Sequence, residues 1–287
     1  MLELVRVAAA GNRFALFDGF RHEPPANPGE VARRVVAQHG VDGLLLLLPP
    51  LSRGEAPAGG AVRMVLYNAD GSRPEACGNG LRAIAKIAVD RGHARGPDLV
   101  VETDAGPRTV EVLRTGERIT AARATLGVPR IEALEETLVA KGEKVRASLI
   151  ELGNPHCVVF VDDPDTAPVA TLGPLLECHP RFPRRTNVEF AKVMNRGVSV
   201  RVWERGVGET LSCGTGATAA AVAAMALGKV SSPVAVWTRG GTLVVRWSGG
   251  EARLEGPVDE PEPLEFVDKE SEPTSPRGGR ARRGGSA

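Results

Sequence analysis

Two short passages in the two halves of the chain have nearly the same sequence, and each runs into an alanine-rich stretch. They are Cys77-Gly78-Asn79-Gly80 and Cys213-Gly214-Thr215-Gly216. Each passage follows a strand-like segment and a polar turn that contains glycine and acidic residues. A strand, a polar turn, Cys-Gly-x-Gly and an apolar helix that occur twice form an internal repeat. This repeat predicts two related domains with a cleft between them.

Most of the remaining chain has the pattern of short strands, because β-branched or alternating segments are bounded by Gly, Pro, Asp or Asn. Strands are expected at 2–7, 14–18, 44–48, 62–67, 99–103, 109–113, 125–128, 147–152, 157–161, 188–194, 198–203, 234–238, 242–248 and 252–255. Helices are expected at 28–39, 81–91 and 217–227, with a weaker pattern at 168–177. The segment 217–227 has no charged residue, which is typical of a helix buried on all sides.

The predicted fold is α+β, with two pseudo-symmetric domains that each wrap a curved, mostly antiparallel sheet around a buried helix. The expected N-terminal domain covers 1–122 and the C-terminal domain 123–259, with 260–267 as a candidate return to the first domain. The segment 269–287 is rich in Pro, Ser, Gly and Arg and almost free of apolar residues. It cannot bury enough surface to offset its ordering entropy, so it is predicted to be a disordered tail.

The composition narrows the class of protein. Hydrophobic residues make up 42% of the 287 residues but aromatic residues only 4%, so the cores must be aliphatic. The formal net charge of +1 argues against a general nucleic-acid binder. No apolar run approaches the ~20 residues that span a bilayer, and the start of the chain lacks the pattern of a signal peptide. We therefore expect a soluble cytoplasmic protein with neither nucleic-acid nor membrane partners.

A thiol at the start of a helix has a physical use. The first helical turn has unpaired N–H groups and a partial positive charge, so it can bind a carboxylate and is expected to lower the pKa of a nearby thiol. Cys77 and Cys213 on either side of one carbon would suit a reaction in which a thiolate removes a proton and a thiol returns one.

The cysteines could also be core residues, zinc ligands or the nucleophile of a hydrolase. Cys157 and Cys178 are expected to be small buried residues of the core, as most free cysteines are. A zinc site at His156-Cys157 and Cys178-His179 is disfavoured, because strand neighbours point to opposite faces and no Cys-x-x-Cys occurs. A hydrolase with His156 as base would leave the second Cys-Gly-x-Gly unexplained. No metal is expected.

Several polar residues could complete the site. Asn154 lies in a turn before His156, and Asn187 lies where a strand is expected to begin. The pair Glu204-Arg205 offers a carboxylate for an ammonium group and a guanidinium for a carboxylate. Each of these residues could instead stabilise a turn or a solvated surface.

The chain resembles the diaminopimelate epimerase family from about residue 5 to residue 267. The resemblance rests on five motifs in the same order: 68–72 with 77–80, 153–156, 187–190, 204–210 and 213–217. It implies a diaminopimelate-epimerase-like fold, a homodimer and a cofactor-independent isomerase. The implied reaction interconverts L,L- and meso-2,6-diaminopimelate, an amino-acid substrate on the path to lysine and peptidoglycan precursors.

The resemblance also implies roles for individual residues. Cys77 and Cys213 would be the acid–base pair, and His156 and Glu204 would tune the pKa values of their thiols. The reacting carboxylate would be held by the residues that follow the two cysteines, which are Gly78, Asn79, Gly214 and Thr215. The substrate, mainly its distal end, would be bound by the remaining polar residues, which are Asn12, Asn68, Asn154, Asn187, Glu204 and Arg205.

The chain departs from the family pattern in three places. Arg13 replaces a usual Asp after Gly11-Asn12, Ala83 stands where a Cys is common, and the segment around Asp42 lacks an amide that some members have. Two alternatives therefore stay open. One is a related cysteine-pair racemase of histidine, proline or hydroxyproline. The other is a non-catalytic amino-acid-binding protein with the same fold.

Overall fold

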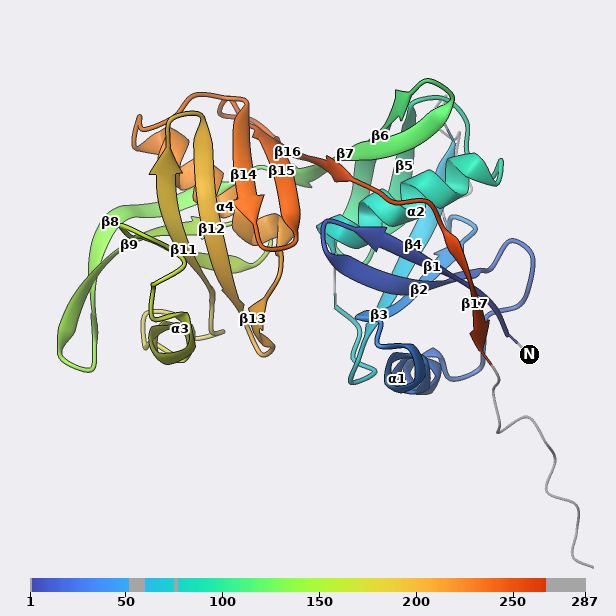
Figure 1. Cartoon of the computed structure of the whole chain (residues 1–287), viewed down its shortest axis with the longest axis horizontal. Helices are drawn as coiled ribbons and strands as arrows, with labels where there is room; N and C mark the ends of the chain where they lie inside the picture. The colour runs from blue at the N-terminus through green and yellow to red at the C-terminus, as the bar shows by residue number, and fades with distance from the viewer. Residues whose placement is uncertain (1, 52–59, 75–76, 267–287) are drawn as a thin grey trace, which may run out of the picture.

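The computed structural model describes residues 2–51, 60–74 and 77–266, which form two lobes side by side (Figure 1). The described residues contain seventeen strands and four helices, so the predicted α+β fold is confirmed. The expected tail at 269–287 lies outside the described residues. No helix in the described part of the chain has the length and apolar character needed to cross a membrane.

The N-lobe is built from the first half of the chain and the last strand. Its elements are β1 (Leu2–Ala9), β2 (Asn12–Asp18), α1 (Pro28–His39), β3 (Gly43–Leu48), β4 (Ala61–Asn68), α2 (Gly78–Asp90), β5 (Asp98–Thr103), β6 (Gly106–Thr115), β7 (Arg118–Gly127) and β17 (Glu262–Phe266). Helix α1 connects the parallel strands β2 and β3, and α2 connects the parallel strands β4 and β5. The other pairs in this lobe are antiparallel.

The C-lobe repeats this arrangement. Its elements are β8 (Arg130–Ala140), β9 (Glu143–Glu151), β10 (Pro155–Phe160), α3 (Val169–Glu177), β11 (Asn187–Met194), β12 (Gly197–Glu204), β13 (Gly208–Thr210), α4 (Gly214–Ala226), β14 (Val234–Thr238), β15 (Gly241–Arg246) and β16 (Ala252–Pro257). Helix α3 connects the parallel strands β10 and β11, and α4 lies between the parallel strands β12 and β14. The two cysteine motifs thus occupy equivalent places in the two lobes.

The lobes are joined by main-chain hydrogen bonds as well as by the chain itself. Strands β7 and β16 pair antiparallel between the lobes, with Gly127 opposite Ala252 and Ala121 opposite Pro257. After β7 the chain enters the C-lobe as β8, and after β16 it returns to the N-lobe, where β17 pairs with β1 (Figure 1). Strand β7 runs through the expected boundary near 121–124, and the division into domains stays a prediction.

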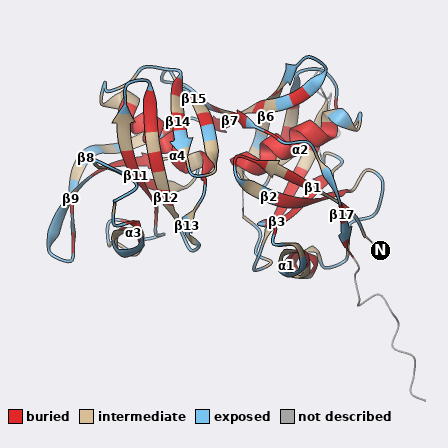
Figure 2. Ribbon diagram, in the orientation of Figure 1, coloured by how far each residue is buried: buried red, intermediate tan, exposed pale blue. Residues whose placement is uncertain are grey.

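The helices that carry the cysteine motifs lie in the centres of the lobes. The burial colouring shows α2 and α4 as buried helices enclosed by strands (Figure 2). Helix α4 is buried from Gly214 to Ala224 apart from Thr215, as its lack of charge predicts. Helix α2 is buried too, although it carries Arg82 and Lys86 at 0% and 1% exposure. All seventeen strands are hydrogen-bonded into one sheet that runs through both lobes, and helices α1 and α3 pack on its strands over smaller apolar clusters.

Three strands were not expected from the sequence. Strand β8 is mostly exposed and is broken by bulges near Ala133, so it has no continuous alternation. Strands β13 and β17 are short, and β17 is held by its pairing with β1 rather than by its own pattern. Helices α2 and α4 begin at glycines, earlier than expected, because glycine gives no helical signal.

Candidate active site

The N-termini of the two central helices meet where the lobes join. A Cβ placed on Gly214 would lie 3.6 Å from the Cα of Gly78 and 2.8 Å from Cδ2 of Leu254. A Cβ on Gly78 would in turn lie 3.8 Å from the Cα of Gly214. The two helix ends are therefore in van der Waals contact, and a side chain on Gly214 would clash with Leu254. Two sets of unpaired N–H groups therefore lie next to each other.

The cysteine of each motif caps its helix. Cys77 Sγ accepts a hydrogen bond from the Gly80 N–H at 3.3 Å, and Cys213 Sγ accepts one from the Gly216 N–H at 3.4 Å. Both cysteines have the extended backbone that is usual for a residue at this position. The two thiols are thus held by the same local geometry, each at the positive end of a helix dipole.

The expectation that the helix termini lower the pKa values of the thiols is wrong for this structure. Burial raises the pKa of Cys77, although the Gly80 N–H acts in the opposite direction. The pKa of Cys213 is raised well above its ordinary value, first by burial and then by the negative charge of Glu204. The loss of hydration of a thiolate outweighs the stabilisation by one N–H group and the helix dipole, so both thiols are neutral at rest.

A cavity of about 1080 Å³ opens between the lobes at these helix ends. Its lining includes every predicted site residue except His156. These residues are Asn12, Asn68, Cys77, Gly78, Asn79, Asn154, Asn187, Glu204, Arg205, Cys213, Gly214 and Thr215. The structure therefore brings together, in one cavity, residues from both halves of the sequence.

His156 lies behind the cavity in the C-lobe, fully buried. Its Nδ1 is 2.7 Å from Oε1 of Glu189, and its Nε2 is 2.9 Å from Oδ1 of Asn154. Glu189 is buried as well, and a Cβ on Gly216 would lie 2.7 Å from Oε1 of Glu189. The second glycine of the motif therefore leaves room for this carboxylate beside the helix that carries Cys213.

Glu204 places a carboxylate near both thiols. Burial raises its pKa, against the hydrogen bond that it accepts from the Thr210 hydroxyl. When ionised, its negative charge raises the pKa values of both Cys77 and Cys213. Glu204 thus acts on the thiols electrostatically.

The turn that follows Glu204 is held from two sides. Asn187 Oδ1 accepts a hydrogen bond from the Arg205 N–H at 3.0 Å, while Asn187 Nδ2 donates to the Pro155 carbonyl. Glu177, at the end of α3, accepts from the Gly206 N–H at 2.9 Å. This role of Glu177 could not be predicted, because α3 lies far from the turn along the chain. The Arg205 side chain is left exposed at the cavity.

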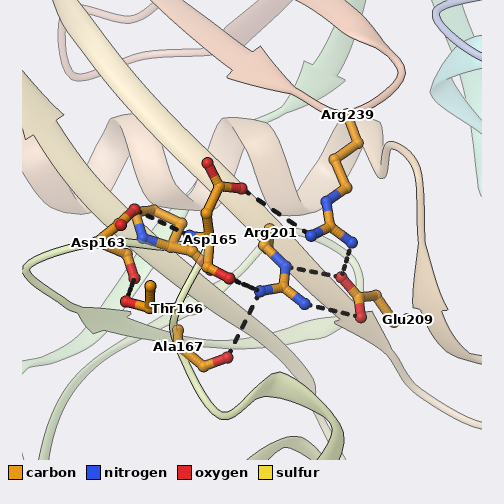
Figure 3. A network of polar contacts seen from close by, with 8 residues as sticks. Asp163, Asp165, Thr166, Ala167, Arg201, Glu209 and Arg239 are labelled. Carbon is orange, nitrogen blue, oxygen red and sulfur yellow. Dashed lines mark hydrogen bonds and ion pairs between the residues drawn. The ribbon is translucent and has the colours of Figure 1, made fainter.

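Strand β13, between this turn and Cys213, is fixed by an ion-pair network (Figure 3). Arg201 forms two hydrogen bonds with the Glu209 carboxylate, at 2.8 and 3.0 Å, and donates to the carbonyls of Pro164 and Asp165. Arg239 adds a bond of 2.9 Å to the same carboxylate. Two-pronged arginine pairs of this kind fix geometry, so the network supports one wall of the cavity.

Sequence reasoning named Asp42 and Glu209 only within longer segments, without a role, and it missed three other charged residues of the cavity, which are Arg73, Arg108 and Arg239. They lie in turns or on strands where a charged side chain usually faces solvent, so their types and spacing gave no signal.

The remaining cysteines lie away from the cavity. Cys157 is fully buried beneath α3, as expected. Cys178 is exposed, so its expected burial is wrong, because it follows the last turn of α3 as the helix reaches the surface. Among the described residues, no group of three or more His, Cys, Asp or Glu is placed to hold a metal ion.

Comparison with known proteins identifies the family of this chain. The family model described as diaminopimelate epimerase matches residues 6–130 and 148–259. The chain is 41% identical over 263 residues to the diaminopimelate epimerase of Moorella thermoacetica, covering 86% of this chain and 92% of that protein. It is 42% identical over 277 residues to that of Desulforudis audaxviator, covering 90% of this chain and 97% of that protein.

Solved structures show the same fold at much lower identity. A hydroxyproline epimerase from Agrobacterium vitis superposes with a TM-score of 0.66 at 15% identity, covering 93% of this chain and 92% of that one. A probable proline racemase from Agrobacterium radiobacter gives 0.70 at 15% identity, covering 95% of each chain. These structures share the fold alone. By the family model and the identity to its relatives, the chain belongs to the diaminopimelate epimerase family.

Proposed function

We propose that this protein is a cofactor-independent epimerase that interconverts L,L- and meso-2,6-diaminopimelate. The observation that carries the proposal is the pair of thiols, Cys77 and Cys213, that cap two abutting helix N-termini in one cavity. The proposed substrate follows from relatives at about 40% identity that are named diaminopimelate epimerase. The racemase alternative is less supported, because the similarity to proline racemase and hydroxyproline epimerase is at the level of the fold.

In the proposed reaction the α-carboxylate binds between the ends of α2 and α4, where N–H groups of both helices are unpaired. Negative charge that develops on the carboxylate as the α-proton leaves is stabilised by these fixed donors. One sulfur, as thiolate, takes the α-proton. The other sulfur, as thiol, gives its proton to the opposite face of the carbon, which inverts the centre and leaves the thiolate on the other side.

The raised pKa values of the thiols fit this scheme. Both thiols are neutral at rest, so one proton must leave the pair before turnover. Glu204 lies in the same cavity with a raised pKa of its own, which suits it to exchange that proton. A strongly basic thiolate, once formed in a site closed to water, is also a better base toward a weakly acidic carbon.

The cavity is asymmetric outside the two motifs, which suits a substrate with two amino-acid heads. The C-lobe contributes Glu204 and Arg205, a carboxylate for an ammonium group and a guanidinium for a carboxylate. The N-lobe contributes Asn68, whose Nδ2 donates to Ser72 and whose Oδ1 could accept a hydrogen bond from a substrate ammonium group. We propose that the two lobes close on the substrate. Assembly as a homodimer and a cytoplasmic location stay predictions.

Deuterium exchange tests the proposal. L,L-diaminopimelate incubated with the protein in deuterated water should give meso product that carries deuterium at the inverted carbon. Cys77→Ala and Cys213→Ala should each abolish epimerisation, whereas Cys178→Ser, a change at an exposed thiol, should not. Exchange into proline or histidine, with none into diaminopimelate, would favour the racemase alternative. Binding without exchange of any amino acid would favour a binding protein.

A further inference from the structure

Four polar side chains form a hydrogen-bond chain along the N-lobe wall of the cavity. Arg82 Nη2 donates to Asn79 Oδ1 at 2.6 Å, and Asn79 Nδ2 donates to Asn12 Oδ1 at 2.5 Å. Asn12 Nδ2 then donates to Asp42 Oδ2 at 3.2 Å. Asp42, Asn12 and Asn79 line the cavity, while Arg82 lies behind them on α2 with no exposed surface.

The two ends of this chain fix its direction. A guanidinium can only donate hydrogen bonds and a carboxylate can only accept them. The amide oxygen of Asn79 must therefore face Arg82, and the amide nitrogen of Asn12 must face Asp42. Each amide nitrogen uses one of its two hydrogens within the chain and keeps the other. Each amide oxygen already accepts one hydrogen bond within the chain, whereas each amide nitrogen keeps one N–H that it can donate to a ligand.

The positive charge of Arg82 also favours an anionic ligand at this wall. No carboxylate pairs with Arg82 among the residues that the structure describes, and its Nε has no hydrogen-bond partner. Burial lowers its pKa to about 10, which leaves it cationic near neutral pH. A buried cation without a counter-charge is costly, and an anion that binds at the start of α2 would reduce that cost.

We propose that Arg82 and Asp42 are positioning residues that fix the direction of this chain, so that Asn79 and Asn12 present donors to a substrate carboxylate. The proposal rests on the proposed function and adds a basis for substrate selection: at Asn79 and Asn12 this wall offers N–H donors, which favour a carboxylate over an ammonium group. Neither residue needs to touch the reacting carbon.

Two variants test the ends of the chain. Asp42→Asn keeps the shape of an exposed side chain but allows that end to donate as well as accept. Arg82→Met removes the buried donor. The matched control is Lys86→Met, which removes the other buried cation of α2, bonded to the Ile119 carbonyl and to Asp90. The probes are pimelate, with two carboxylates and no amines, and 1,5-diaminopentane, with two amines and no carboxylates.

Calorimetry should show pimelate affinity falling about threefold to fivefold in Asp42→Asn and about tenfold in Arg82→Met, as for the loss of one hydrogen bond or of one to a charged group. The affinity for 1,5-diaminopentane should not fall in either variant. The KM for diaminopimelate should rise by factors similar to those for pimelate. Lys86→Met should lower Tm and leave pimelate affinity unchanged.

The double variant should lose less than the product of the two single losses, because either change already frees the chain, whereas independent sites multiply. Unchanged pimelate affinity in Asp42→Asn, equal losses for both probes, or no pimelate binding by the parent protein would overturn the inference. If Arg82→Met does not fold, Asp42→Asn decides alone. Calorimetry needs no turnover, so a parent that binds pimelate but exchanges no diaminopimelate proton refutes the proposed function separately.

Discussion

The close approach of α2 and α4 predicts that two equivalent glycines tolerate alanine differently. A methyl group on Gly214 would lie 2.8 Å from Cδ2 of Leu254, a side chain with 0% exposure, whereas one on Gly78 would lie 3.4 Å from the same atom. The first distance forces neighbouring groups to move, and the second is close to ordinary contact. The pair Gly214→Ala and Gly78→Ala therefore separates steric strain from loss of the helix-end site.

The expected magnitudes follow from two opposing effects. Alanine in place of glycine favours a helix by up to about 1 kcal/mol, and overpacking a filled core costs about 1–3 kcal/mol. Gly214→Ala should therefore lose up to about 2 kcal/mol of unfolding free energy, and Gly78→Ala should lose none. At about 2–4 °C per kcal/mol for a chain of this size, their Tm values should differ by about 3–10 °C.

Activity should fall in both variants for a shared reason. Each methyl group would lie at the helix ends where the carboxylate is proposed to bind, and losing one preorganised donor typically costs about 10²-fold or more in kcat. Thermal unfolding by circular dichroism and the deuterium-exchange assay measure the two effects. The reasoning is refuted if Gly214→Ala is as stable as Gly78→Ala, or if Gly78→Ala epimerises at the parent rate.

Three further predictions concern charge and redox state. Burial raises the pKa of Glu204, so its favourable contribution to stability is fully present below about pH 4.5 and is lost as the pH rises from there through the raised pKa of the folded state. Glu204→Gln should therefore raise Tm at about pH 7, the gain should vanish near about pH 4, and epimerisation should fall. Burial acts to raise the pKa of Asp18, but hydrogen bonds from His93 and Arg91 outweigh it and leave the pKa lowered. The free energy of unfolding should therefore fall as the pH drops below about 4. In urea titrations, Asp18→Asn should lower the free energy of unfolding by about 1.5–3 kcal/mol at neutral pH and make its decline in acid less steep. Mild oxidation should link Cys77 to Cys213 and stop turnover until a thiol reductant is added. Mass spectrometry identifies the disulfide, and full activity of the crosslinked protein in the exchange assay would contradict the geometry in which both thiols face one carbon.

Local sequence was enough to predict the parts of the fold that depend on local physics. The apolar pattern of α4 predicted a helix buried on all sides, and the structure has it. Strand β8 escaped prediction because its glutamate-rich, bulged pattern has no regular period. Helices α2 and α4 begin three residues before their predicted starts, at Gly78 and Gly214, because glycine has a low helix propensity and the extended cysteines before them act as N-caps.

The sequence by itself determined the repeated thiols, the glycines beside them and the polar residues that the cavity gathers from both halves. These features could be recognised because a repeat with a capping side chain and glycines is a local sequence pattern that does not depend on the surrounding structure. The resting protonation of the thiols was decided only by the tertiary structure: helix termini favour a thiolate, but burial between the lobes outweighs them. The direction of the chain from Arg82 to Asp42 was decided there too, because four side chains from separate elements must meet before a donor at one end and an acceptor at the other can orient the amides between them.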